Sequence, residues 1–152
     1  MTKFTSPCPP PTPQQARATW NLIGRLLTMA QRMRDAIDHQ PVSPYRTEIM
    51  TILAEECCEA VQRATKLLRF GVEEKQPDQP YTNAERLGLE IGDVETMLCH
   101  ARRLDLFLGE TSLHAAISDA IEEGIMTIDY IHAGKTNKES QLAKFLQSTG
   151  KA

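Results

Sequence analysis

Two runs of acidic residues interrupt segments whose apolar residues recur at helical spacing: Glu55, Glu56 and Glu59 in the first, and Glu90 and Asp93 in the second. At about 100° per residue, Glu56 and Glu90 fall on apolar stripes that must face a core, and the other three lie toward the edges of those stripes. If the two helices pack along their stripes, at least four carboxylates meet in one small space. Clustered carboxylate oxygens are the ligands that hard divalent cations prefer.

Such a cluster needs positive charge, because burying even one unpaired carboxylate is costly and like charges repel each other. Lys or Arg, protons or a metal ion can supply the compensation. Arg63, four residues after Glu59, is a candidate for a salt bridge, but most other nearby positions hold Ile, Leu or Ala. Since the acidic set contains neither His nor Cys, it favours Mg²⁺ or Mn²⁺ over zinc. The sequence therefore predicts a magnesium centre, with a solvated acidic face on a plain bundle as the alternative.

Apolar periodicity and helix-ending residues predict four or five helices and no strand. Ser43-Pro44 is a typical helix start, and Thr82 with Glu85 matches a capping box. Gly134 is expected to end a long fourth helix. Short connections between long helices favour antiparallel neighbours, so the fold class is an all-α antiparallel helix bundle. The expected helices cover residues 14–38, 43–70, 82–109, 111–133 and 138–147, within a single domain of residues 14–148.

The overall composition excludes several classes of protein. The 152 residues carry 17 Lys and Arg against 20 Asp and Glu, for a net charge of −3, which gives no reason to expect binding to a nucleic acid polymer. No apolar run approaches the roughly 18 residues that a membrane span needs. Residues 1–13 are rich in proline and are expected to form a disordered or extended arm without the features of a secretory signal. Four cysteines without zinc-site spacing favour free thiols and a cytoplasmic location.

The acidic pattern also resembles a known family. Glu55-Glu56-x-x-Glu59 followed by Glu90-x-x-Asp93 is similar to the signature of the MazG-like all-α nucleoside triphosphate pyrophosphohydrolases. The resemblance covers residues 49–101, and within this range the segments 66–71 and 89–94 also fit the family's pattern. It implies a MazG-like bundle and Mg²⁺-dependent hydrolysis of nucleoside triphosphates between the α and β phosphates, which yields the monophosphate and pyrophosphate.

The resemblance also implies roles for individual residues. Glu55 matches the first acid of the motif and is expected to be catalytic, as an extra ligand or as the base that orients the attacking water. Arg86 and Lys66 are expected to bind the substrate phosphates. The expected metal ligands are Glu56, Glu59, Glu90 and Asp93.

The sequence allows more than one oligomeric state, more than one role for Trp20 and more than one function. The family implies a homodimer or homotetramer, and Lys135 or Lys138 is expected to be able to reach substrate from a neighbouring subunit. Trp20 is expected to anchor the core, with base stacking as the alternative role. A dUTP-type or phosphoribosyl-ATP-type pyrophosphohydrolase is one alternative function. A catalytically silent helical binding protein is the other.

Overall fold

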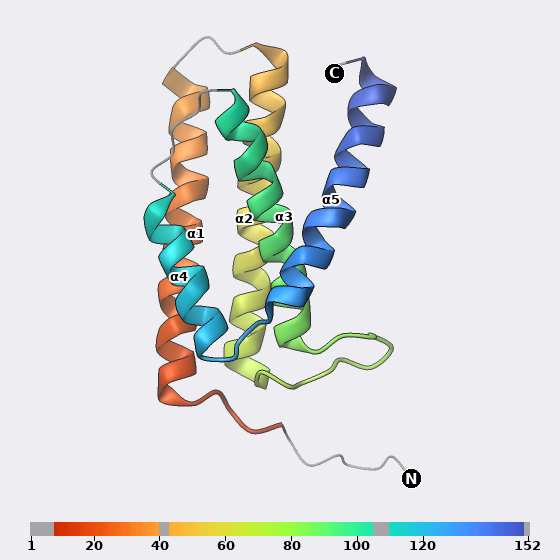
Figure 1. Cartoon of the computed structure of the whole chain (residues 1–152). Helices are drawn as coiled ribbons and strands as arrows, with labels where there is room; N and C mark the ends of the chain where they lie inside the picture. Colours follow the sequence, from red (N-terminus) through yellow and green to blue (C-terminus); the bar gives the residue numbers. More distant parts are fainter. Residues whose placement is uncertain (1–7, 40–42, 105–109, 151–152) are drawn as a thin grey trace.

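The chain folds into an all-α helix bundle, which confirms the fold class expected from the sequence. The computed structural model describes residues 8–39, 43–104 and 110–150, and within these ranges it contains five α-helices and no strand (Figure 1). The helices are α1 (Pro13–His39), α2 (Pro44–Phe70), α3 (Asn83–Arg103), α4 (Thr111–Glu122) and α5 (Ile128–Thr149).

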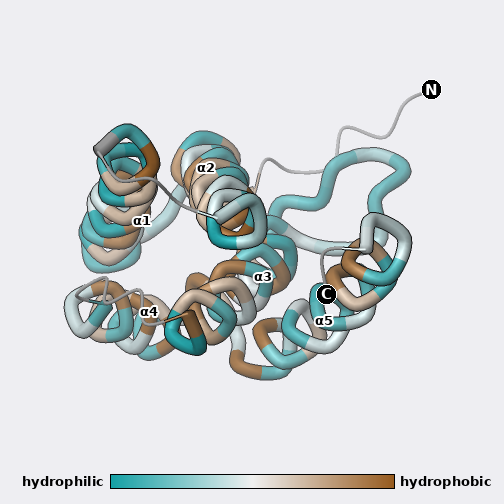
Figure 2. Tube along the Cα trace, turned by 90° about the horizontal axis from the view of Figure 1, so that it is seen from above, coloured by the Kyte–Doolittle hydropathy of each residue, from teal (hydrophilic) through white to brown (hydrophobic). Residues whose placement is uncertain are grey.

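The helices are arranged in two rows. Seen from above, α1 and α2 form one row, and α4, α3 and α5 form the other (Figure 2). Helix α3 lies at the centre, because it packs against both α2 and α5, while α1 packs against α2 and α4. The side chains between the rows form a single apolar core; its largest fully buried members include Leu22, Leu26, Met33, Leu53, Leu87, Ile91 and Met97.

The first turns of α2 and α3 have the capping interactions that the sequence predicts. The Ser43 hydroxyl accepts a hydrogen bond from the Arg46 amide. The Thr82 hydroxyl accepts one from the Glu85 amide at 3.2 Å, and the Glu85 carboxylate accepts one from the Thr82 amide at 2.7 Å. These bonds satisfy amides that a helix start leaves unpaired. They also fix where the two acid-bearing helices begin.

The predicted long fourth helix is wrong, since it divides into α4 and α5. Helix α4 ends at Glu122, the chain turns through Gly124 with φ of +72°, and α5 starts at Ile128. Periodicity did not reveal this break, because both helices present apolar residues to the same core and the stripe continues across the turn. Gly134, predicted as a helix stop, lies inside α5.

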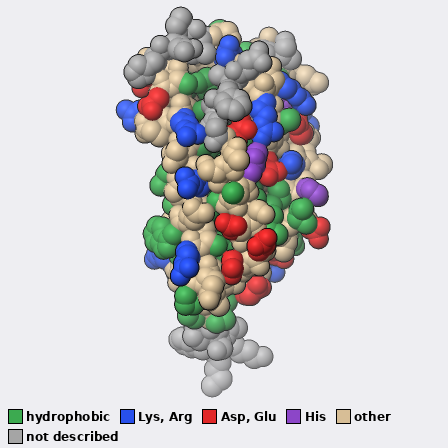
Figure 3. All heavy atoms as spheres, turned by 60° about the vertical axis from the view of Figure 1, so that its left-hand side comes forward, with side chains coloured by type: hydrophobic (Ala, Val, Ile, Leu, Met, Phe, Trp, Pro, Cys, Tyr) green, Lys and Arg blue, Asp and Glu red, His purple; other side chains and the backbone are tan. Residues whose placement is uncertain are grey.

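The structure also bears on the end of α3, the role of Trp20 and the proline-rich arm. Helix α3 ends at Arg103, whereas Gly109, its expected end, lies outside the described residues. Trp20 does not anchor the core, because 61% of it is exposed on α1. The face formed by α1 and α4 mixes apolar, basic and acidic side chains (Figure 3). Of the proline-rich arm, residues 1–7 lie outside the described part, and residues 8–12 run as irregular chain into α1.

Glycines let α3 and α5 approach each other closely. A Cβ atom at Gly92 would lie 2.3 Å from the Ile131 carbonyl oxygen, and one at Gly134 would lie 2.2 Å from the Leu89 carbonyl oxygen. Both distances are too short for any side chain. Helix α5 therefore packs directly against the backbone of α3. This contact fixes the register of α5 along α3, and so the position of the residues that follow Gly134.

This contact leads to a stability prediction. We expect Gly134→Ala to lower the free energy of unfolding by about 1–3 kcal/mol through overpacking, even though alanine is about 1 kcal/mol more favourable than glycine within a helix. The matched control is Gly24→Ala in α1, where the added Cβ meets nothing within 4 Å and stability should rise. Urea unfolding of both variants measures the difference. Equal behaviour of the two variants would contradict the close contact between α3 and α5.

Candidate metal centre

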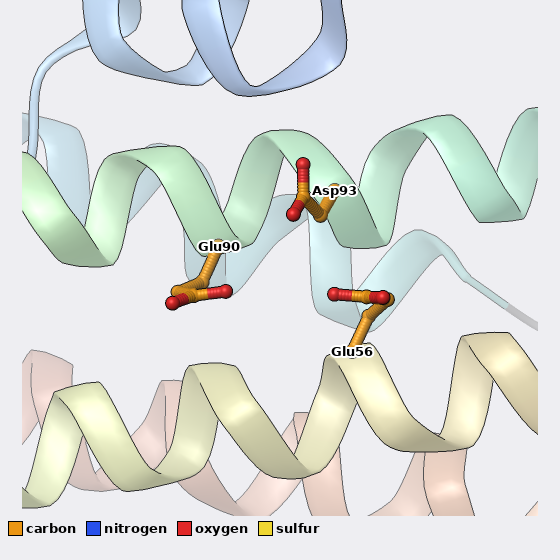
Figure 4. A group of neighbouring side chains, drawn as sticks. All are labelled: Glu56, Glu90 and Asp93. Carbon is orange, nitrogen blue, oxygen red and sulfur yellow. The ribbon is translucent and has the colours of Figure 1, made fainter. Parts of the chain in front are cut away.

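Three carboxylates from α2 and α3 meet between the two helices. Glu56 projects from α2 and Glu90 from α3 into the space between these helices, and the Asp93 side chain lies against α3 nearby (Figure 4). One oxygen from each of the three side chains lies within 4.8 Å of the others. Glu56 is buried, with 6% of its surface exposed, and the other two are half-buried. The packing of α2 against α3 thus brings together Glu56 and Glu90, the two acids that interrupt the apolar stripes.

The structure provides a counter-charge that sequence spacing did not indicate. Lys138 of α5 donates a hydrogen bond from Nζ to Glu56 Oε1. Both side chains are largely buried, with 13% of the lysine and 7% of the glutamate exposed. Lys138 lies one helical turn after Gly134, so the close contact between α3 and α5 brings its ammonium group to the acids. It therefore reaches the centre within its own chain, where the sequence suggested a neighbouring subunit.

Arg63 neutralises a different acid from the one expected. Its Nε donates a hydrogen bond to Glu90 Oε1 at 3.2 Å, and both side chains are mostly buried. The sequence suggested a pair with Glu59 at the i+4 position of the same helix, but Glu59 is exposed. The pair with Glu90 joins α2 to α3. The three acids therefore have one buried cation near each end, from Lys138 and Arg63.

Burial raises the proton affinity of the two acids on α3. Burial, and then the negative charge of Glu56, raise the pKa of Asp93 to about 7, although the positive charge of Lys138 opposes the change. Burial also raises the pKa of Glu90, against the opposing hydrogen bond from Arg63. Asp93 accepts no hydrogen bond from the described part of the chain. Burial and the acidic neighbours thus disfavour the ionised form of both acids on α3, and a further cation bound there would lower this cost.

These shifts predict how stability depends on pH in the absence of metal. Because the folded protein holds the Asp93 proton more tightly than the unfolded chain, the free energy of unfolding should fall as pH rises from about 3.8 to about 7. Above that window Asp93 is ionised in both states and adds no further slope. Urea unfolding in EDTA across the window measures the effect. Asp93→Asn should flatten the slope, and an unchanged slope would contradict the shift.

Glu55 and Glu59 lie outside the buried group. Both are exposed on α2, and neither belongs to the three carboxylates whose oxygens meet. Glu59 is still close enough for its charge to raise the pKa values of Glu90 and Asp93. Glu55 lines a hollow that also borders Glu56. The structure thus brings three of the four expected ligands together, and Glu59 lies beside them on α2.

The two expected phosphate-binding residues differ in their surroundings. Arg86 lies one turn before Glu90 on α3 and donates a hydrogen bond to Gln76 at 3.0 Å. Partial burial, followed by the positive charge of Arg63, lowers the pKa of Arg86, so these two guanidinium groups share one region of positive potential. Lys66 is half-exposed, further along α2. The structure places Arg86 beside the acids and gives no contact between Lys66 and them.

Two hollows flank α5. One, of about 390 Å³, lies against the side of α3 that carries Glu95 and holds that residue's ion pair with Lys135. The other, of about 280 Å³, lies between α2 and α5 and is bordered by Glu56 and Lys138. Only the smaller hollow touches one of the three clustered acids, so it is the one that belongs to the candidate centre.

Comparison of the chain with protein-family models, curated proteins and solved structures found no match. Among the described helices, none has the length and apolar character needed to cross a membrane.

Proposed function

We propose that this protein is a Mg²⁺-dependent nucleotide pyrophosphohydrolase, which hydrolyses nucleoside triphosphates to the monophosphate and pyrophosphate. The observation that carries the proposal is the meeting of Glu56, Glu90 and Asp93 between two helices, with oxygens within 4.8 Å of one another. A partly buried, oxygen-only set of carboxylates that repel one another fits Mg²⁺ or Mn²⁺. The resemblance of the acidic pattern to the MazG-like enzymes supports the same assignment.

The proposed reaction requires neutralised charge and correct alignment more than covalent help. Water attacks one of the two phosphorus atoms that flank the oxygen bridging the α and β phosphates. The bond between that phosphorus and the bridging oxygen breaks, and the water proton passes to solvent. A bound Mg²⁺ supplies charge neutralisation and lowers the pKa of a coordinated water. Glu56, Glu90 and Asp93 would hold the ion, and Arg63 and Arg86 are the proposed partners of the phosphate oxygens.

The exposed acids have proposed roles at the rim of this site. Glu59, whose charge acts on Glu90 and Asp93, is proposed to help hold a metal once substrate is present. Glu55 borders the adjoining hollow and is the proposed residue for orienting the attacking water. Lys66 remains a proposed contact for the outer phosphates. A homodimer or homotetramer is proposed on the family resemblance, and the exposed Trp20 and Leu27 on α1 offer apolar area for such contacts.

A specific observation favours a second candidate, a catalytically silent helical binding protein. The pair between Lys138 and Glu56 already satisfies the most buried acid of the cluster. If that pair is permanent, the acids and lysine form a structural ion-pair network and no metal enters.

Product analysis separates these candidates. Purified protein is incubated with ribo- and deoxyribonucleoside triphosphates and with phosphoribosyl-ATP, in Mg²⁺, Mn²⁺ or EDTA, and pyrophosphate and monophosphate are quantified. The proposal predicts equal amounts of both products, formed only with the metal. Turnover of dUTP alone or phosphoribosyl-ATP alone identifies the narrower enzyme. Absence of pyrophosphate with every nucleotide would refute the enzymatic proposal and leave the binding protein.

A further inference from the structure

The groups beside the acids differ at the two ends of the cluster. Toward the N-terminal half of α2, Glu56 is paired with Lys138 and borders the hollow of about 280 Å³. Toward the C-terminal half of α2, Glu90 is paired with Arg63. Arg86 lies one turn before Glu90, and its pKa responds to the charge of Arg63. Because α2 and α3 run in opposite directions (Figure 1), the hollow, the acids and the two arginines follow one another in that order along the two helices.

The hollow has the character of a small-molecule site. Ile52 of α2 and Leu142 and Phe145 of α5 provide its apolar lining, and the amide of Gln141 lies on the same wall. Its volume is just below the range of about 300–1,000 Å³ typical of ligand pockets. It therefore suits a fragment such as a nucleobase better than a whole nucleotide.

Charge decides which end of a nucleotide the hollow and the two arginines can each bind. The carboxylate of Glu55, which is exposed on α2, also lines the hollow, so a polyphosphate there would be repelled. A neutral base lacks this penalty, since its faces can contact apolar and aromatic side chains and its edge can pair with an amide. Two neighbouring guanidinium groups at the opposite end match the charge of phosphates.

From this order we propose that the hollow between α2 and α5 binds the nucleobase of the substrate. Phe145 and Ile52 contact the base and Gln141 contacts its edge, while the polyphosphate runs across the acids to Arg63 and Arg86. This inference rests on the proposed function and adds the orientation of the substrate. Lys138, at the junction between the hollow and the acids, then lies beside the first phosphate.

Binding measurements with and without a base test this orientation. The probes are the α,β-methylene analogues of ATP, CTP, GTP and UTP, and inorganic tripolyphosphate, each titrated calorimetrically with Mg²⁺. We expect Phe145→Ala to weaken binding of the preferred analogue by about tenfold, the effect of losing one aromatic contact to a base, and to leave tripolyphosphate binding within about twofold. Phe145→Leu keeps apolar volume and serves as a second variant if Phe145→Ala unfolds. Lys144→Ala, an exposed neighbour on α5, is the control.

A reciprocal variant tests the other end. Arg86→Gln should weaken tripolyphosphate and the preferred analogue to a similar degree. Equal effects of the Phe145 variants on both kinds of probe, or no effect on the analogues, would overturn the proposed orientation even if wild-type protein releases pyrophosphate. Wild-type protein that binds no analogue and releases no pyrophosphate would overturn the proposed function together with the orientation.

Discussion

Replacing Asp93 by asparagine is expected to slow pyrophosphate release by about a hundredfold or more, the size of effect found when one group that stabilises charge in a transition state is removed. The amide keeps the shape of the side chain and removes its negative charge. In the metal-free protein the same change should be stabilising at neutral pH. The reason is that the native site disfavours ionised Asp93, as its raised pKa of about 7 shows.

Steady-state rates and thermal unfolding in EDTA and in Mg²⁺ measure both effects. The matched control is Glu95→Gln, because Glu95 is two residues further along α3 and pairs with Lys135 outside the acidic cluster. Its rate should remain near that of the wild type. The Mg²⁺-dependent rise in the unfolding temperature should be large in wild type and small in Asp93→Asn. Equal rises in both proteins would place the ion elsewhere.

Replacing Lys138 by methionine is expected to destabilise the metal-free protein by about 3 kcal/mol or more, because removal of one partner leaves the other charge buried and unpaired. Mg²⁺ should restore much of this loss, since the ion replaces the missing positive charge beside Glu56. The apparent affinity for Mg²⁺ should therefore be higher in Lys138→Met than in wild type. Urea unfolding at a series of Mg²⁺ concentrations gives both quantities through the linkage of binding to stability.

Lys135→Met provides the matched control on the same helix. Lys135 pairs with Glu95, and 43% of its side chain is exposed, so its loss should cost less than about 1 kcal/mol. The double variant Glu56→Gln with Lys138→Met should recover most of the stability lost in Lys138→Met alone. If Lys138→Met is as stable as the wild type without metal, the pair between Lys138 and Glu56 does not stabilise the protein.

The local structure of the two acid-bearing helices was predictable from sequence. Serine followed by proline at residues 43–44 and the capping box at Thr82 set the starts of α2 and α3 by local hydrogen bonds. The apolar periodicity placed Glu56 and Glu90 on inward faces, and both are at least half-buried. Local signals sufficed because they act over only a few residues along the chain.

Predictions that depended on which surfaces meet were less successful. Gly134 resembles a helix stop, yet it lies inside α5. A glycine is needed there because the backbone of α3 occupies the space that a side chain would fill. Trp20 has the residue type and spacing of a core anchor, but it lies on a side of α1 that the other described helices leave exposed. Neither outcome is encoded in a short window of sequence, since each depends on the position of another helix.

By itself, the sequence determined the all-helical class, the starts of α2 and α3, and the placement of two carboxylates on faces that must be buried. The tertiary structure alone decided which cations meet them: Lys138 reaches Glu56 from 82 positions along the chain, and Arg63 pairs with Glu90 across α2 and α3. The physical reason is the register between packed helices. A shift of one helical turn moves a side chain by about 5.4 Å, which is enough to break either ion pair.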